Sequence, residues 1–153
     1  MEDVKSERVV ELLKEAYFDE FESAMNYLSH AVALEGVRAE RVADSLRDDV
    51  QEEVGHAEEI AERLEVLDEV PPGPVHFEDT QEELVPPERP VTDVERTIQG
   101  VISAEEDAVS HYRELAAAAE EAGDRATRHM AEEFIEDEEQ HLDEFESYLE
   151  EYR

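Results

Sequence analysis

The sequence predicts an all-α fold, in which two antiparallel helix pairs joined by a long proline-rich crossover form a four-helix bundle. Three observations support this fold class. Four stretches carry apolar residues at helical spacing, one glycine separates the two stretches in each half, and all six prolines lie between positions 71 and 90. Because 153 residues suit one continuous core, we expect a single domain over residues 1–153.

The first half predicts two helices, over residues 5–35 and 38–68, with Gly36 as the C-cap between them. Each helix has one apolar row: Val9, Leu13, Ala16, Tyr17, Ala24, Tyr27, Leu28, Ala31 and Leu34 in the first, and Val42, Leu46, Val50, Ala57, Ile60, Leu64 and Leu67 in the second. Each row also contains one acid, Glu20 or Glu53. These acids lie almost equally far from Gly36 along the chain, one before it and one after it, so a reversal there brings them side by side.

Residues 70–91 predict a linker, because they contain every proline of the chain: Pro71, Pro72, Pro74, Pro86, Pro87 and Pro90. Proline lacks a backbone N–H and breaks helices. When extended, a linker of this length can span a helix of about 30 residues, about 45 Å. We therefore expect a crossover that joins two parallel helices.

The second half predicts a matching pair of helices, over residues 93–121 and 124–151. Residues 92–95 have the form of a capping box, Gly123 suits a C-cap, and Asp124 suits the N-cap of the last helix. The apolar rows consist of Val94, Ile98, Val101, Ala108, Tyr112, Leu115 and Ala119, and of Thr127, Ala131, Phe134, Leu142, Phe145 and Tyr148.

A repeat relates the two halves of the chain. The quartet Glu53-Val54-Gly55-His56 has a counterpart in the second half, Glu138-Glu139-Gln140-His141. The offset from Glu53 to Glu138 also relates Glu20 to Glu105 and Tyr27 to Tyr112. A Glu and a His three residues apart on a helix face the same side, so each quartet offers a carboxylate and an imidazole to a shared metal. A single match is weak evidence among 34 glutamates and six histidines; the common offset strengthens it.

The candidate metal ligands are the four acids in the apolar rows and two histidines: Glu20, Glu53, His56, Glu105, Glu138 and His141. A buried anion is costly unless it is compensated, and two divalent cations would formally balance four carboxylates. Oxygen and nitrogen donors without sulfur suit iron or manganese better than a closed zinc site. The alternative is that these acids are solvated residues on misassigned helix faces.

Composition excludes several function classes. The 46 acidic and 13 basic residues give a formal charge of -33, which argues against nucleic acids or anionic membranes as partners and favours cations. So acidic and lysine-poor a surface is typical of proteins from salt-loving organisms, where salt screens self-repulsion. The absence of cysteine excludes disulfides, iron–sulfur clusters and rubredoxin-type iron centres. Because residues 1–14 lack the apolar segment of a signal peptide and no apolar run approaches a membrane span, we expect a cytoplasmic protein.

Three segments resemble the first, second and fourth helices of bacterioferritins and related ferritin-like proteins: Asp19-Glu-Phe-Glu-Ser-Ala-Met-Asn-Tyr-Leu-Ser-His30, Glu53-Val-Gly-His-Ala-Glu-Glu-Ile-Ala-Glu-Arg-Leu64 and Asp137-Glu-Glu-Gln-His-Leu-Asp143. The resemblance covers nearly the whole chain. It implies a ferritin-like bundle with a di-iron ferroxidase centre, in which Glu53 and Glu138 bridge both irons and each remaining Glu and His serves one. Tyr27 and Tyr112 would hydrogen-bond carboxylates or pass an electron, although buried aromatic residues usually only fill the core.

The resemblance implies a ferroxidase and iron-storage function. Each subunit would bind two iron ions, with manganese as the alternative metal, and oxidise Fe(II) with dioxygen or peroxide. Storage would take place in a homo-oligomeric shell of 12 or 24 subunits, with a dimer as the minimum. The alternative function is a di-iron or di-manganese peroxide-detoxifying enzyme, similar to rubrerythrin or manganese catalase, without mineral storage. A third interpretation is a bundle whose metal only holds the helices together.

Three features depart from these relatives. Haem-containing bacterioferritins place a haem-ligating Met directly after the bridging Glu of the second helix, and here that position is Val54, so no haem is expected there. The sequence continues only from His141 to Arg153, so we expect no fifth helix of the kind that lines the channels of large ferritin cages. Ala108 stands where rubrerythrins carry an additional iron-binding Glu, which weakens the peroxidase interpretation.

A few polar residues do not fit the repeat. Glu22 lies off the apolar row, so we expect it on a solvated face of its helix. His30, His111 and His129 are expected at the surface or at an interface, and His76 in the linker has no predicted role.

Overall fold

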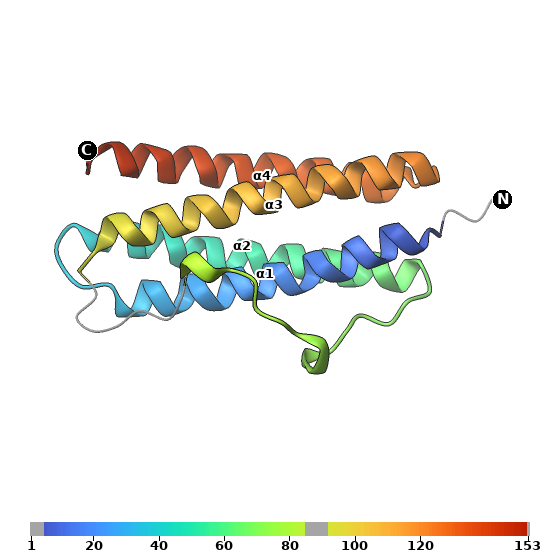
Figure 1. The fold of residues 1–153 in the computed structure, drawn as a ribbon, viewed down its shortest axis with the longest axis horizontal. Coiled ribbons are helices and arrows are strands. Elements are labelled where there is room, and N and C mark those ends of the chain that lie inside the picture. The colour runs from blue at the N-terminus through green and yellow to red at the C-terminus, as the bar shows by residue number, and fades with distance from the viewer. Residues whose placement is uncertain (1–4, 85–91, 153) are drawn as a thin grey trace.

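The computed structural model describes residues 5–84 and 92–152. Within these ranges lie four long helices, α1 (Glu7–Ala33), α2 (Ala39–Val66), α3 (Val94–Ala122) and α4 (Arg125–Glu150), and two short 3-10 helices between α2 and α3, η1 (Pro74–His76) and η2 (Glu82–Leu84). Helices α1 and α2 form one antiparallel hairpin and α3 and α4 form the other, while α2 and α3 run in the same direction (Figure 1). The predicted all-α four-helix bundle is confirmed. No helix in the described ranges combines the length and apolar composition that a bilayer crossing requires.

Side-chain caps mark the start of three helices. Ser6, Asp93 and Asp124 each accept a hydrogen bond from the backbone N–H three residues further on, at the starts of α1, α3 and α4. The N-cap of α3 is therefore Asp93, the second residue of the capping-box pattern. Gly123 ends α3 with φ 75°, a left-handed conformation that glycine adopts without steric cost.

The turn between α1 and α2 differs from the prediction. The C-cap of α1 is Leu34, whose N–H bonds to the carbonyl oxygen of His30. Gly36 lies two residues further on with φ 115°, where a side chain would strain the backbone. The glycine thus shapes the turn and does not cap the helix.

The apolar rows form two buried clusters along the length of the bundle. One cluster includes Tyr27, Leu46, Ile98 and Phe145, and the other includes Leu13, Ile60, Tyr112 and Phe134. In every long helix the candidate metal ligands separate the residues of one cluster from those of the other. The polar side chains therefore lie between two apolar clusters. Leu28, which was predicted as core, is 47% exposed, because it falls at the edge of its row.

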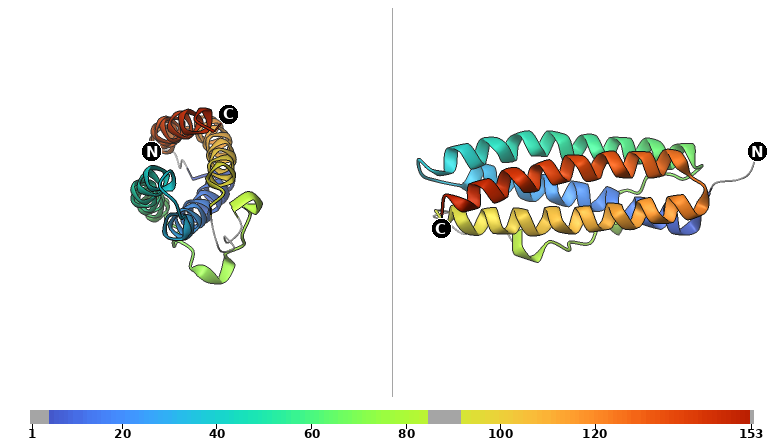
Figure 2. Two further views of the ribbon diagram at one scale, coloured as in Figure 1. Left: turned by 90° about the vertical axis from the view of Figure 1, so that its left-hand side faces the viewer. Right: turned by 90° about the horizontal axis from the view of Figure 1, so that it is seen from above.

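Viewed along the bundle, the helices follow one another in the order α2, α1, α3, α4 (Figure 2). Contacts are extensive within each hairpin and between α1 and α3, and sparse between α2 and α4. The α2–α4 side is therefore the more open side of the bundle.

The segment that follows α2 is held on the outside of α1 by Glu22. This carboxylate accepts hydrogen bonds from the backbone N–H groups of Thr80 and Gln81, at 2.8 and 2.7 Å, and from the Thr80 hydroxyl at 2.9 Å. Glu22 is only 5% exposed, so the solvated position predicted for it is wrong. Helical periodicity cannot show such a partner, because it lies far along the chain in an irregular segment.

The same segment reaches α3 through Leu84. Its side chain is buried and packs on Gly100, where an added Cβ would lie 2.8 Å from Leu84 Cδ2 and 3.0 Å from the carbonyl oxygen of Glu83. Only glycine leaves room for this approach. The described part of the crossover is thus attached to both α1 and α3.

Candidate metal centre

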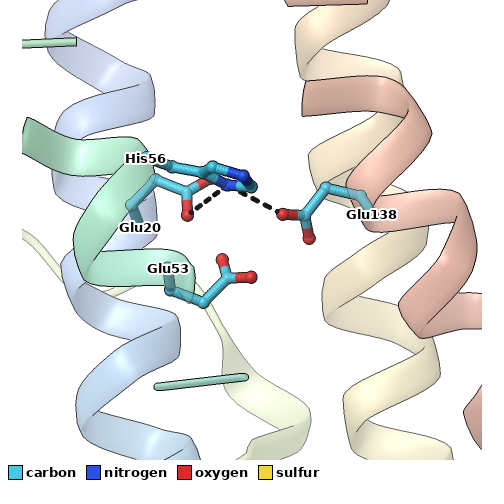
Figure 3. Close-up of side chains that lie close together, drawn as sticks. All are labelled: Glu20, Glu53, His56 and Glu138. Atoms are coloured by element: carbon cyan, nitrogen blue, oxygen red, sulfur yellow. Dashed lines mark ion pairs between the residues drawn. The ribbon is translucent and has the colours of Figure 1, made fainter. Parts of the chain in front are cut away.

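Six side chains meet between the two apolar clusters. They come from all four long helices: Glu20 from α1, Glu53 and His56 from α2, Glu105 from α3, and Glu138 and His141 from α4. Each is at most 4% exposed, although carboxylates are almost never buried unless they are paired. Figure 3 shows Glu20, Glu53, His56 and Glu138 turned toward one another. The fold brings all six candidates into one buried cluster.

The donor atoms of this cluster fall into two overlapping groups. One group consists of Glu20, Glu53, His56 and Glu138, and the other of Glu53, Glu105, Glu138 and His141. Within each group, one nitrogen or oxygen atom from every residue lies within 4.8 Å of the others. Glu53 and Glu138 belong to both groups. The arrangement could therefore hold two cations, with two carboxylates shared between them.

Both imidazoles direct Nδ1 toward the carboxylates. His56 Nδ1 lies 3.1 Å from Glu138 Oε1 and 3.4 Å from Glu20 Oε2 (Figure 3). His141 Nδ1 lies 3.4 Å from Glu53 Oε1 and 3.6 Å from Glu105 Oε1. The nitrogen and oxygen donors thus face a common interior.

Buried polar atoms without a hydrogen bond concentrate in this cluster. Among the described residues, eight such side-chain atoms occur: Glu20 Oε2, Asp49 Oδ2, Glu53 Oε1, His56 Nδ1, Glu105 Oε2, both oxygens of Glu138, and His141 Nδ1. Seven of the eight belong to the six candidate ligands. Leaving a buried polar group unsatisfied costs about 1–3 kcal/mol, and more when it is charged. Two cations coordinated by the seven atoms of the candidate ligands would satisfy these seven, so the donor set fits a dinuclear metal site.

The electrostatics of the cluster also favour cations. Burial raises the pKa of Glu53 well above its usual range, and the nearby charges of Glu20 and Glu138 raise it further. Burial lowers the pKa of the two histidines, but the carboxylates that face their Nδ1 atoms outweigh it, so the pKa of His56 rises to about 11 and that of His141 to about 12. The carboxylates thus hold protons on the imidazoles. A divalent cation could replace these protons.

Two carboxylates that the sequence prediction missed hold the outer nitrogens of the histidines. His56 Nε2 lies 2.8 Å from Asp137 Oδ2, and His141 Nε2 lies 2.7 Å from Glu52 Oε2. Such contacts orient a metal-binding histidine and raise its basicity. Glu52 and Asp137 directly precede Glu53 and Glu138 and obey the same offset, so the repeat contained the signal that identifies them.

The two predicted tyrosines reach across the bundle to carboxylates. The Tyr27 hydroxyl donates a hydrogen bond to Glu105 Oε1, and the Tyr112 hydroxyl donates one to Glu20 Oε1. Both phenols are buried, and burial raises the pKa of each well above its usual range. They are therefore protonated hydrogen-bond donors at neutral pH.

The remaining histidines lie outside the cluster. His30, which was expected at the surface or at an interface, is buried within this chain, with Nδ1 2.8 Å from the carbonyl oxygen of Asn26. His111 Nε2 lies 2.9 Å from the carbonyl oxygen of Leu12 and so connects α3 to α1. His129 and His76 are exposed.

Solved structures with the same fold include a bacterioferritin and other ferritin-like proteins. A ferritin-like, diiron-carboxylate protein from Bacillus anthracis str. Ames superposes with a TM-score of 0.81 at 19% identity, covering 97% of this chain and 99% of the other. BfrA from M. tuberculosis gives 0.81 at 22% identity, covering 95% and 85%. Rhodobacter capsulatus bacterioferritin, described with a metal-free dinuclear site and a haem iron, gives 0.79 at 27% identity, covering 97% and 87%.

The sequence itself matches a known family over most of its length. No curated protein is significantly similar to it. Residues 10–153 match the ferritin-like domain family, and these residues include all four long helices apart from the first turn of α1. The suspected relationship to ferritin-like proteins is confirmed, and this chain belongs to the ferritin-like domain family.

Proposed function

We propose that the protein is a ferroxidase that binds two Fe(II) ions in its bundle, oxidises them, and stores the Fe(III) in a homo-oligomeric shell. The observation that carries the proposal is the set of seven unsatisfied donor atoms in two overlapping groups. The dinuclear site described for the Rhodobacter capsulatus bacterioferritin supports the same stoichiometry.

Each residue has a role in this proposal. Glu53 and Glu138, which belong to both groups, would bridge the two ions. Each ion would have two further ligands that it does not share. These would be Glu20 and His56 at one metal position, and Glu105 and His141 at the other.

Fe(II) is the substrate of the proposed reaction. Two Fe(II) ions supply two electrons, which with two protons reduce dioxygen to hydrogen peroxide, or hydrogen peroxide to two water molecules. Carboxylate oxygens suit the resulting Fe(III). Tyr27 and Tyr112 would hold Glu105 and Glu20 in place by hydrogen bonds, and we also propose that they pass an electron during oxidation.

An exposed apolar row on α1 supports assembly into a homo-oligomer. Met25, Leu28 and Val32 are all exposed and lie on one face of the helix, since they are three and four residues apart. Grouped apolar side chains at a surface are typical of protein–protein contacts. The particle mass, measured by light scattering in high salt that screens the acidic surface, tests the proposed shell of 12 or 24 subunits.

The central test is aerobic addition of Fe(II) to the protein, followed by absorbance from ferric species. We expect Glu53→Ala combined with Glu138→Ala to abolish fast oxidation, because both shared carboxylates are lost. The matched control is Glu58→Ala combined with Glu139→Ala, which removes two exposed glutamates from the same helices. Equal oxidation rates in the two double variants would refute the proposal.

A peroxide-detoxifying enzyme remains the second candidate, because an oxygen and nitrogen donor set without sulfur suits manganese as well as iron. This function predicts rapid turnover of hydrogen peroxide and no retained mineral. Gel filtration followed by iron staining distinguishes the two, since only a storage protein carries a ferric core through the column.

A further inference from the structure

The internal repeat is broken at one buried position beside the metal centre. Asp49 on α2 and Phe134 on α4 are related by the offset that relates Glu53 to Glu138, so they occupy equivalent places in the two hairpins. Both side chains are buried. One half of the site therefore has a carboxyl group where the other half has an apolar ring.

These two residues contact the two candidate histidine ligands. Asp49 Oδ1 lies 3.4 Å from His141 Nε2, in addition to Glu52 Oε2 at 2.7 Å. The ring of Phe134 stacks on His56, with centroids 4.1 Å apart and planes inclined by 29°. Among the described residues, the outer nitrogen of His56 has one carboxylate within 4.0 Å, that of Asp137 at 2.8 Å. Glu52 lies further away, within 4.8 Å of His56 and Asp137.

The second carboxylate oxygen of Asp49 lacks the hydrogen bond that a buried structural carboxylate normally has. Asp49 Oδ2 is buried without a hydrogen bond, and it is the only such atom in residues 5–84 and 92–152 outside the six candidate ligands. A buried carboxyl with a free oxygen is costly unless positive charge lies nearby. A cation held by His141 would supply that charge.

From this asymmetry we propose that the two metal positions differ in affinity, and that the position formed with Glu105 and His141 is filled first. The inference rests on the proposed function, because it requires two bound cations. Asp49 is a positioning residue that acts through His141: a second carboxyl beside Nε2 makes the imidazole a stronger donor at Nδ1 and adds negative charge near the ion. Phe134 offers the His56 position no such charge.

The test is a calorimetric titration of the metal-free full-length protein with Co(II) alone, in high salt. The wild type should bind two equivalents in two resolved steps. Removing an outer-shell partner of a metal ligand typically costs 10-fold to 100-fold in affinity, so Asp49→Asn should weaken the first step by about 10-fold or more and bring the two steps together. Asp48→Asn is the matched control, because it removes the same charge from an exposed neighbour on α2.

Two further measurements assign the effect to Asp49. Phe134→Leu, which removes the ring without adding a carboxyl, should keep two unequal steps. Anomalous scattering from crystals containing one equivalent of Co(II) should place the ion beside Glu105 and His141. Thermal unfolding of each variant checks that it is folded before titration.

The outcomes separate this inference from the proposed function. Two steps of equal affinity in the wild type, an Asp49→Asn titration that matches Asp48→Asn, or a first ion beside Glu20 and His56 would overturn the inference and leave the dinuclear site intact. No Co(II) bound by the wild type would overturn both.

Discussion

The carboxylate of Glu52 lies 2.7 Å from Nε2 of His141, which belongs to the opposite helical hairpin. The equivalent contact, from Asp137 to His56, crosses the bundle in the other direction. Each hairpin thus orients a candidate ligand of its partner. The geometry of the site therefore depends on how the two hairpins dock.

Removing these carboxylates should weaken metal binding without unfolding the bundle. For Glu52→Gln and Asp137→Asn we expect a loss of about 10-fold to 100-fold in metal affinity, because the imidazoles lose the negatively charged partner that raises their basicity. Competition for Co(II) against a chelator measures the change. Glu58→Gln and Asp143→Asn, exposed on the same helices, are the controls, and an equal loss in them would mean that only net charge matters.

Removing the tyrosine hydroxyls should destabilise the metal-free protein. In Tyr27→Phe and Tyr112→Phe, a buried carboxylate oxygen of Glu105 or Glu20 loses its donor, at a cost of about 1–3 kcal/mol. Urea unfolding of each variant measures this cost, and Tyr152→Phe, at the far end of the chain, is the control. If the phenols also pass electrons, iron oxidation slows while two metal ions still bind. Unchanged rates in both variants would limit the tyrosines to their hydrogen bonds.

The metal-free protein should lose stability as the pH rises above neutrality. The pKa of His56 is raised to about 11 and that of His141 to about 12, compared with about 6.5 in an unfolded chain. Groups with a raised pKa in the folded state contribute stability that is complete below the unfolded pKa and is lost as the pH rises through the folded pKa. Glu53, whose pKa is also raised, acts in the same direction.

Unfolding free energies between pH 6.5 and pH 10 check this sign. The metal-free protein should become less stable over the whole interval. The Co(II)-loaded protein should show a smaller loss, since the cation replaces the protons on the ligands. A metal-free profile that is flat or rises with pH would contradict the expected direction.

The crossover attachment at Gly100 predicts opposite effects for two glycine substitutions. In Gly100→Ala the new methyl group meets Leu84 and the backbone of Glu83. Overpacking of this kind costs about 1–3 kcal/mol, more than the roughly 1 kcal/mol that alanine gains in a helix. Gly55→Ala meets nothing within 4 Å and should stabilise α2 by about 0.5–1 kcal/mol. Thermal unfolding of both variants measures the difference. Equal changes in melting temperature would show that the crossover segment moves away from the new methyl group at no cost in stability.

Much of the fold could be predicted because its signals are local. The rows of apolar residues require only a helical period, and the four long helices follow from them. The internal repeat in the sequence predicts the six candidates, because two hairpins with the same internal spacing place equivalent residues at the same height along the bundle. These candidates are Glu20, Glu53, His56, Glu105, Glu138 and His141. The structure brings these six together; their role as ligands stays a proposal.

Other residues could not be placed from the sequence, because their partners lie on other elements. Glu22 is a charged residue of a type usually found at the surface, yet it is buried under Thr80 and Gln81. These two partners lie in a segment without helical periodicity. Asp49 looks like one of many acids on α2, and only its distance to His141 distinguishes it.

The chain by itself thus determined the helices, their pairing and the family, because hydrophobic spacing and the repeat act along the backbone. Only the tertiary structure decided which carboxylates hold the outer nitrogens of His56 and His141, and that the two halves of the site differ at Asp49 and Phe134. The physical reason is that burial and hydrogen-bond partners are set by the packing of helices against one another, which no single helix encodes.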